Sequence, residues 1–283
     1  MKSRFEYKKL LNAKMINYIE NIRHELGLDN LLDEAGSLLG QLIDPTPGQS
    51  GLALRAAGRR VNLEGLLLIA LASGIAERIE TPVYDARRLF AALPALREMT
   101  RANRDFLSEL AQTLNAAGVI LVALPTLEGS RLNGAMRHLS DRYLLLVTDR
   151  LHYADTFWFT LFHEVAHILR ADDERLGCGT EEDEADALSG ELLFPDEVGY
   201  RRFLLEADRF SARGIERYAK STGIDPALVL GRLQKENIVS YQSHLGARLR
   251  RRLYLDGPYP FRGRAIVQNP IDQSLQVLIS REG

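Results

Sequence analysis

The fold prediction starts from the segment Phe157-Trp158-Phe159-Thr160-Leu161-Phe162-His163-Glu164-Val165-Ala166-His167. Its apolar residues recur at helical spacing, and we expect a helix over Phe157 to Arg170. Residues four apart lie on one face of a helix, so the imidazoles of His163 and His167 can point at one ion, with Glu164 beside them. This spacing predicts a metal site built on the helix.

The pattern His-Glu-x-x-His is typical of hydrolytic chemistry as well as of zinc binding. Zinc lowers the pKa of a bound water toward about 7, and a glutamate next to that water can take its proton. We therefore predict that Glu164 is the catalytic residue that polarises the attacking water. Hydrolysis of a peptide bond is the reaction that this combination favours.

A catalytic zinc site normally has three protein ligands, so a third ligand must come from elsewhere in the chain. The acidic run Glu181 to Asp186 begins a second helix, expected over Glu182 to Leu193, on which Glu182 and Asp186 share a face. We assign Glu182 to the metal, with Glu181 as the alternative ligand, and Asp186 to the remaining N–H of a ligating histidine. The competing interpretation is a solvated helix start that the helix dipole favours.

Zinc is the expected cofactor, at one ion per chain. Histidine and carboxylate ligands also accept manganese and iron, so the ligand types alone do not exclude Mn²⁺ or Fe²⁺.

Residues 1–81 are expected to form a helical N-terminal region of unassigned role. Apolar positions at helical spacing run from Phe5 to Leu42, the turn formers Asp44 to Gly51 indicate a linker, and a helix follows from about Val61 to Arg78. The apolar run Leu66 to Ala72 is far shorter than the ~20 residues that cross a bilayer. We expect it to lie in the core.

Residues 82–253 are expected to form the domain that carries the metal site, including a helical part from about 200 to 253. A helical series from Tyr84 to about Asn115 precedes an apolar, β-rich run at Val119 to Leu124. A β-hairpin of residues 134–139 and 143–148 follows. These patterns predict an α+β fold whose small sheet is mostly antiparallel.

Residues 254–283 are expected to form a short appendix. Glycine and proline residues there separate two β-like runs, Arg264 to Gln268 and Leu275 to Ser280.

In its metal-site helices the sequence resembles the ImmA/IrrE family of zinc metallopeptidases. The family pattern is a helical H-E-x-x-H followed by a helix of the form E-x-x-A-N-x-F-A-x-x-L-L-x-P. Residues 182–195 are EDEADALSGELLFP, with Asp186 where the family usually has Asn and Leu188-Ser189 where it usually has Phe-Ala. The resemblance implies a zincin-like core in which His163, His167 and Glu182 hold zinc.

Residues from about Tyr84 to Arg252 are more specifically similar to the peptidase-like half of HigA-type regulators, in which a DNA-binding domain precedes this module. The similarity is carried by four segments: LPTLEG at 124–129, NGA at 133–135, FWFTLFHE at 157–164 and GIDPALVLGRLQ at 223–234. No convincing helix-turn-helix domain is seen at the N-terminus. The resemblance then implies a zinc-dependent endopeptidase that cleaves a separately encoded helix-turn-helix repressor, which would switch on a stress, phage-defence or mobile-element response.

A rival hypothesis of a different class is a non-catalytic regulatory or antitoxin-like module that keeps zinc for stability and binds protein or DNA. Glu164 argues against it, because a purely structural zinc site needs ligands but no general base.

The charge balance and the cysteine content limit which partners and which cellular compartment are expected. The chain has 36 basic and 38 acidic residues in 283, so it has no overall positive field that would attract nucleic acid. Its single cysteine, Cys178, excludes an internal disulfide framework. The N-terminal residues interleave charges with apolar residues and lack the pattern of a secretory signal. We expect a cytoplasmic protein without membrane contact.

Two basic features could in principle contact DNA, and we interpret both as structural. Ser211 to Gln234 has a helix-turn-helix pattern with Gly223 at the turn, and Arg248 to Arg252 is a dense basic run. We favour structural packing for the helix-turn-helix pattern and a solvated helix face for the basic run. Direct DNA binding is therefore not expected.

The hairpin before the metal helix is a candidate substrate platform. Asn133 to Leu139 would present a free strand edge to an extended peptide, although an interior pair of strands fits the pattern equally well. Tyr143, His138 and Tyr153 are the alternatives for a group that stabilises the oxyanion, and the sequence does not choose among them.

Overall fold

The computed structural model describes residues 11–26, 36–40, 42, 61–171, 181–206, 210–260 and 263–269. The expected linker at Asp44 to Gly51, the expected strand at Leu275 to Ser280 and Cys178 lie outside these ranges. The helices are α2 (Ala13–Leu26), α4 (Leu63–Ala76), α5 (Ala86–Met99), α6 (Leu107–Asn115), α7 (Ala154–Ala171), α8 (Glu181–Leu193), α9 (Glu197–Phe203), α10 (Ala212–Thr222), α11 (Pro226–Lys235) and α12 (Leu245–Leu249). The strands are β1 (Val119–Leu124), β2 (Gly134–Leu139), β3 (Arg142–Thr148), β4 (Arg252–Leu255) and β5 (Ala265–Gln268).

The central sheet has the strand order β1-β3-β2. The hairpin expected at β2 and β3 is confirmed, with Ala135 opposite Leu146 in an antiparallel pair. β1 pairs with β3 in parallel, with Leu121 opposite Leu145. The expectation of a mostly antiparallel sheet is therefore wrong for this mixed sheet, although β4 and β5 also pair antiparallel. The mixture of helices and small sheets agrees with the α+β class.

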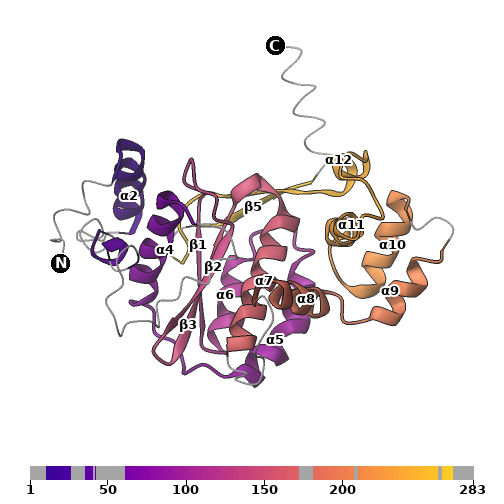
Figure 1. Cartoon of the computed structure of the whole chain (residues 1–283), viewed down its shortest axis with the longest axis horizontal. Coiled ribbons are helices and arrows are strands. Elements are labelled where there is room, and N and C mark those ends of the chain that lie inside the picture. The colour runs from indigo at the N-terminus through magenta and orange to yellow at the C-terminus, as the bar shows by residue number, and fades with distance from the viewer. Residues whose placement is uncertain are drawn as a thin grey trace, which may run out of the picture.

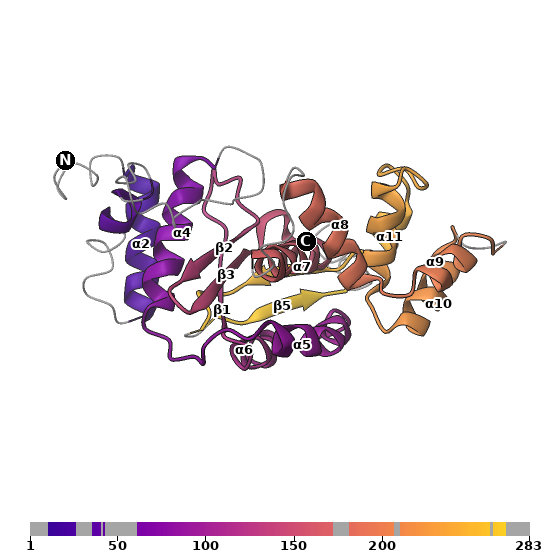
Figure 2. The ribbon, with the colours of Figure 1, turned by 60° about the horizontal axis from the view of Figure 1, so that its bottom comes forward.

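The sheet lies between two layers of helices, which explains why β1 and β3 are apolar on both faces. Ile120 and Leu144 point to the side covered by α2 and α4, and Leu121 and Leu145 point to the side covered by α5, α6 and α7. Figures 1 and 2 show α2 and α4 together on one side of the strands and α5 and α6 on the other. The expected N-terminal region thus shares a core with the sheet.

Helix α4 confirms the expected helix from about Val61 and the burial of its apolar run. Asn62 caps its first turn by accepting a hydrogen bond from the Gly65 amide at 3.2 Å. Every residue from Leu67 to Ala76 is buried. No helix in the described ranges combines the length and the apolar character that a membrane span needs.

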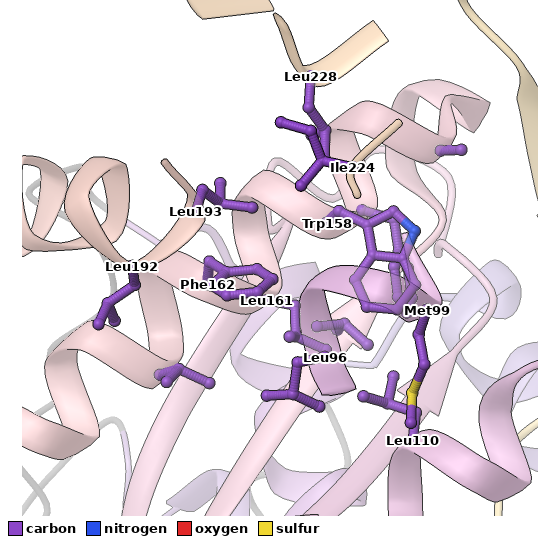
Figure 3. Packing of buried hydrophobic residues seen from close by; sticks show 14 of the residues in the cluster. Leu96, Met99, Leu110, Trp158, Leu161, Phe162, Leu192, Leu193, Ile224 and Leu228 are labelled. Atoms are coloured by element: carbon purple, nitrogen blue, oxygen red, sulfur yellow. The ribbon is translucent and has the colours of Figure 1, made fainter. Parts of the chain in front are cut away.

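Helix α7 is the central helix on its side of the sheet. Trp158 and Phe162 are almost fully buried, and Figure 3 shows them among side chains of α5, α6, α8 and the α10–α11 region. The labelled neighbours are Leu96, Met99, Leu110, Leu161, Leu192, Leu193, Ile224 and Leu228. Removing a buried aromatic side chain from such a core costs about 3–5 kcal/mol. The apolar lead-in therefore fixes the helix that carries the histidines.

Two expected helical segments differ from the structure. The series from Tyr84 to Asn115 is broken into α5 and α6, and Asp105 accepts a hydrogen bond from the Leu107 amide at 3.2 Å where α6 begins. The chain does not stay helical to Leu253, because α12 ends at Leu249 and β4 begins at Arg252 to pair with β5.

The remaining helices, α9 to α12, form a group at the end of the molecule opposite to α2 and α4 (Figure 1). Gly223 lies between α10 and α11 in the left-handed region, with φ +76°, where a residue without a side chain costs least.

Candidate metal centre

Helix α7 places two imidazoles toward one point. His163 and His167 are one turn apart, and their Nε2 atoms are 3.0 Å from each other. His167 is 3% exposed and His163 is 15% exposed, so both rings sit in a largely dry environment. At this distance the two nitrogens can share a proton in a hydrogen bond or bind one cation between them.

Helix α8 supplies the third group. It packs along α7 and brings Glu182 to the two rings, with Oε2 3.3 Å from Nε2 of His163 and Oε1 3.5 Å from Nε2 of His167. The other predicted ligand, Glu181, opens α8, and its side chain is outside what the structure describes. The preferred sequence assignment, Glu182, lies at the histidines, whereas the alternative, Glu181, cannot be compared because its side chain lies outside the described part of the chain.

The separations between these groups are of the size that a shared small cation requires. The two Nε2 atoms are 3.0 Å apart, and each lies near a different oxygen of Glu182, at 3.3 Å for Oε2 and 3.5 Å for Oε1. Ligand atoms about 2.1 Å from a tetrahedral zinc are about 3.4 Å from one another. In the part of the chain that the structure describes, His163, His167 and Glu182 are the group whose ligand atoms lie together, all within 4.8 Å. Two imidazoles and a carboxylate suit zinc.

Asp186 lies beside the same histidine, as the i, i+4 spacing from Glu182 predicts. Its Oδ1 is 2.9 Å from Nδ1 of His163, and its Oδ2 is 3.0 Å from Nζ of Lys235. Partial burial acts to raise the pKa of Asp186, but the hydrogen bond and charge of Lys235, together with His163, hold that pKa below its ordinary value. The ionised carboxylate can accept a hydrogen bond from Nδ1–H, which leaves Nε2 of His163 to face Glu182.

Glu164 is the most deeply buried acid of the site. It is 2% exposed, and its Oε2 has no hydrogen-bond partner. Burial is the largest cause that raises the pKa of Glu164 to about 8; the charge of Glu182 raises it further, and a hydrogen bond from the Met136 amide opposes both. A buried carboxyl whose pKa lies near neutrality is suited to exchange a proton with a water molecule.

Gly134, which the sequence indicates as the start of a strand and as part of a segment that carries the resemblance, also packs against the site. A Cβ at this position would lie 2.5 Å from Cγ2 of Thr160, 2.8 Å from the Leu146 carbonyl oxygen and 3.3 Å from Cγ of Glu164. The missing side chain therefore lets β2 approach α7 closely enough for Met136 to reach Glu164. A glycine inside a strand pattern signals such a close approach.

Comparisons with protein-family models, with curated proteins and with solved structures give no match for this chain. The resemblance to the ImmA/IrrE family accordingly stays a prediction, carried by the residues quoted for it. The site is described by its own geometry.

The three candidates for an oxyanion-stabilising group make other contacts. Tyr153 lies under the guanidinium groups of Arg250 and Arg252, 3.7 and 4.1 Å from its ring centroid. Tyr143 packs edge-on against Tyr84 and also contacts the ring of His138. These contacts do not single out any of the three as the group that stabilises the oxyanion.

The segment with a helix-turn-helix pattern forms α10 and α11, and its second helix is mostly covered. The buried residues of α11 are Ala227, Leu228, Val229, Leu230, Leu233 and Gln234. Arg232 lies over the Tyr200 ring at 3.5 Å and pairs with Glu197 at 2.7 Å. A recognition helix must expose its side chains to a DNA groove, so this arrangement supports packing.

The basic run before β4 is not a solvated face throughout, which corrects the sequence interpretation. Arg251 is buried and forms an ion pair with Asp225, and Arg250 pairs with buried Asp155 at 2.8 Å. Arg248 remains exposed on α12.

Proposed function

We propose that this protein is a zinc-dependent endopeptidase with a zincin-like core. The observation that carries the proposal is a buried glutamate with one unpartnered oxygen, Glu164, next to a His163, His167 and Glu182 group whose donor atoms are spaced for zinc. A site that held zinc only for stability would need the three donors but would gain nothing from an unpartnered buried carboxyl oxygen, which costs about 1–3 kcal/mol. This cost favours the enzyme over the non-catalytic module.

Each residue has a separate task in this proposal. His163, His167 and Glu182 hold the ion, which supplies Lewis acidity and lowers the pKa of water toward about 7. Glu164 takes a proton from the attacking water and returns it to the leaving amine. Asp186 orients the His163 ring through Nδ1. Glu182 is the most exposed of the three ligands, with 30% of its side chain accessible, so we expect the substrate to approach the ion from that side.

An extended peptide can be seated on β2. This strand is at an edge of the three-stranded sheet, so its backbone groups that point away from β3, apart from the Met136 amide that donates to Glu164, can pair with another strand. The Met136 amide already points to Glu164. A peptide laid along β2 would therefore pass close to the carboxyl that handles the proton.

The substrate and the compartment are proposed from the resemblance. We infer that the substrate is a helix-turn-helix transcriptional repressor, that its cleavage switches on a stress, phage-defence or mobile-element response, and that the protein works in the cytoplasm.

The first experiment combines metal analysis with a cleavage assay. We expect about one zinc per chain in the purified protein, and loss of the repressor encoded nearest to it when the two are co-expressed. Glu164→Gln should keep the metal and leave the repressor intact, because an amide cannot accept the proton. Glu191→Gln, which changes an exposed glutamate on α8, is the matched control and should cleave like the wild type.

The outcomes separate the parts of the proposal. A protein that binds no zinc contradicts the metal centre. Zinc with an uncut repressor in both proteins rejects this substrate, and a further failure to cut any peptide of a random pool rejects the peptidase. Equal cleavage by wild type and Glu164→Gln rejects Glu164 as the catalytic residue.

A further inference from the structure

Lys235 is connected to the candidate metal centre through Asp186, although it lies 49 positions further along the chain. It is the last residue of α11, and its Nζ is 3.0 Å from Oδ2 of Asp186. The other oxygen of the same carboxylate, Oδ1, is 2.9 Å from Nδ1 of His163. One carboxylate therefore joins a lysine on α11 to a metal-ligating histidine on α7.

The backbone that carries Lys235 is held firmly against the site. Gly231 of α11 lies so close to α7 that a Cβ there would be 2.6 Å from the Phe159 ring. One turn before the end of the helix, Arg232 is fixed by Glu236 at 2.8 Å and by the ring of Tyr200. The backbone position of Lys235 is thus set by the packing of α11, and its side chain, 64% exposed, extends from there to Asp186.

Asp186 needs such a restraint. Its side chain is 49% exposed, so water competes for both of its oxygens and the carboxylate can rotate away from the histidine. A partner on Oδ2 restricts that rotation and keeps Oδ1 at Nδ1 of His163. The hydrogen bond on Nδ1 decides which ring nitrogen carries the proton, and hence whether Nε2 is free to bind a cation.

We propose that Lys235 is a positioning residue that holds Asp186 in place and thereby fixes the tautomer of His163 for metal binding. This inference rests on the proposed zinc site. It gives α11 a role in that site, whereas the sequence pattern of α10 and α11 alone indicates only packing.

The direction in which zinc affinity changes when Lys235 is replaced separates a positioning role from simple charge repulsion. A lysine near a bound cation repels it, so removal of the charge alone should strengthen zinc binding. If Lys235 positions Asp186, its removal should instead weaken zinc binding. Changing residues that support a ligating histidine typically costs about 10–100-fold in metal affinity, and we expect about threefold to tenfold for Lys235, which acts through Asp186.

The test uses the full-length protein and compares Lys235→Met, Lys235→Arg, Asp186→Asn and the double variant Lys235→Met/Asp186→Asn. Zinc affinity is measured by competition with a chromogenic chelator. The protonation of the His163 nitrogens is measured by ¹⁵N NMR of the metal-free protein. Lys220→Met, which removes an exposed lysine on α10, is the matched control.

We expect weaker zinc binding and a smaller fraction of the Nδ1-protonated tautomer in Lys235→Met, recovery of both in Lys235→Arg, and wild-type values in Lys220→Met. In the Asp186→Asn background, Lys235→Met should have little weakening effect, because the neutral amide forms no ion pair with the ammonium group. Unchanged or tighter binding together with an unchanged tautomer in Lys235→Met would overturn the proposal. A wild type that binds no zinc would reject the metal centre, and the NMR comparison alone would then decide the function of Lys235.

Discussion

At the scale of single residues, Gly134 allows a close approach between the sheet and the candidate site. We predict that Gly134→Ala lowers the free energy of unfolding by about 1–3 kcal/mol, because the new methyl group overlaps Thr160 and the Leu146 carbonyl. It should also lower peptidase activity more than zinc affinity, since Cγ of Glu164 lies next to the added atom while the ligands do not. Urea unfolding and a peptide cleavage assay measure the two effects.

A second glycine provides the control for Gly134. Nothing lies within 4 Å of a Cβ built at Gly190, which is inside α8. Gly190→Ala should therefore leave activity unchanged and stabilise the protein by up to about 1 kcal/mol through its higher helix propensity. Equal stability of Gly134→Ala and the wild type would show that β2 can move away from α7 at little cost.

Which site residues can be predicted from the sequence depends on how local their relations are. His163, Glu164 and His167 follow from helical spacing alone, and Asp186 follows from Glu182 by one further turn. Lys235 could not be found in this way, because its contact with Asp186 requires the docking of α11, which no local pattern specifies.

At the scale of elements, the same distinction separates the hairpin from the parallel strand pair. β2 and β3 are joined by a tight turn, so their antiparallel register is a local property of the sequence. β1 does not pair with β2, the next strand in the sequence, but with β3. Its continuous apolar run shows only that it is buried on both faces. Which strand β1 pairs with, and in which direction, depends instead on how the strands pack between the two helix layers.

The contact between α9 and α10 makes a prediction for alkaline pH. Tyr218 stacks on Phe203 with ring centroids 4.5 Å apart, and burial is the largest cause that raises the pKa of Tyr218 from 10.0 to about 12. Between these values the unfolded chain releases the phenol proton and the folded chain keeps it, so the free energy of unfolding falls as pH rises. Tyr218→Phe removes this contribution, which we expect to be about 1–2 kcal/mol.

Urea unfolding at about pH 9 and about pH 11.5 measures this difference. Other groups titrate over the same range in both proteins, so the informative quantity is the change in the gap between wild type and Tyr218→Phe. The phenylalanine keeps the stacked ring. Parallel loss of stability in the two proteins would show that Tyr218 ionises in the folded state as it does in the unfolded chain.

At the scale of the whole molecule, one buried side chain joins three segments that are far apart in the sequence. Arg251, just before β4, donates hydrogen bonds to the Thr100 and Ala102 carbonyl oxygens after α5 and to Asn103, and it forms an ion pair with Asp225 at the start of α11. The sequence places Arg251 within a basic run, and its burial could not be predicted because each of these partners is non-local.

We predict that Arg251→Met lowers the free energy of unfolding by about 3–5 kcal/mol, because it leaves the carboxylate of Asp225 buried without its partner. Arg248→Met, three residues earlier and exposed on α12, should change stability by less than about 0.5 kcal/mol. Both values come from urea unfolding at neutral pH. A similar small effect for the two variants would mean that water reaches Asp225 when the arginine is absent.

The double variant Arg251→Met/Asp225→Asn tests the cause of that loss. Asp225 accepts a hydrogen bond from the Ala227 amide at 2.7 Å and so caps α11, and asparagine caps a helix about as well as aspartate. The double variant therefore keeps the cap but has no unpaired buried charge, and it should recover a large part of the stability lost in Arg251→Met. If the stability losses of the two single changes add instead, the hydrogen bonds of Arg251 to the residues after α5 are what hold the C-terminal helices in place. Zinc affinity should then fall together with stability, because Lys235 is carried by the same helix α11 that Asp225 caps.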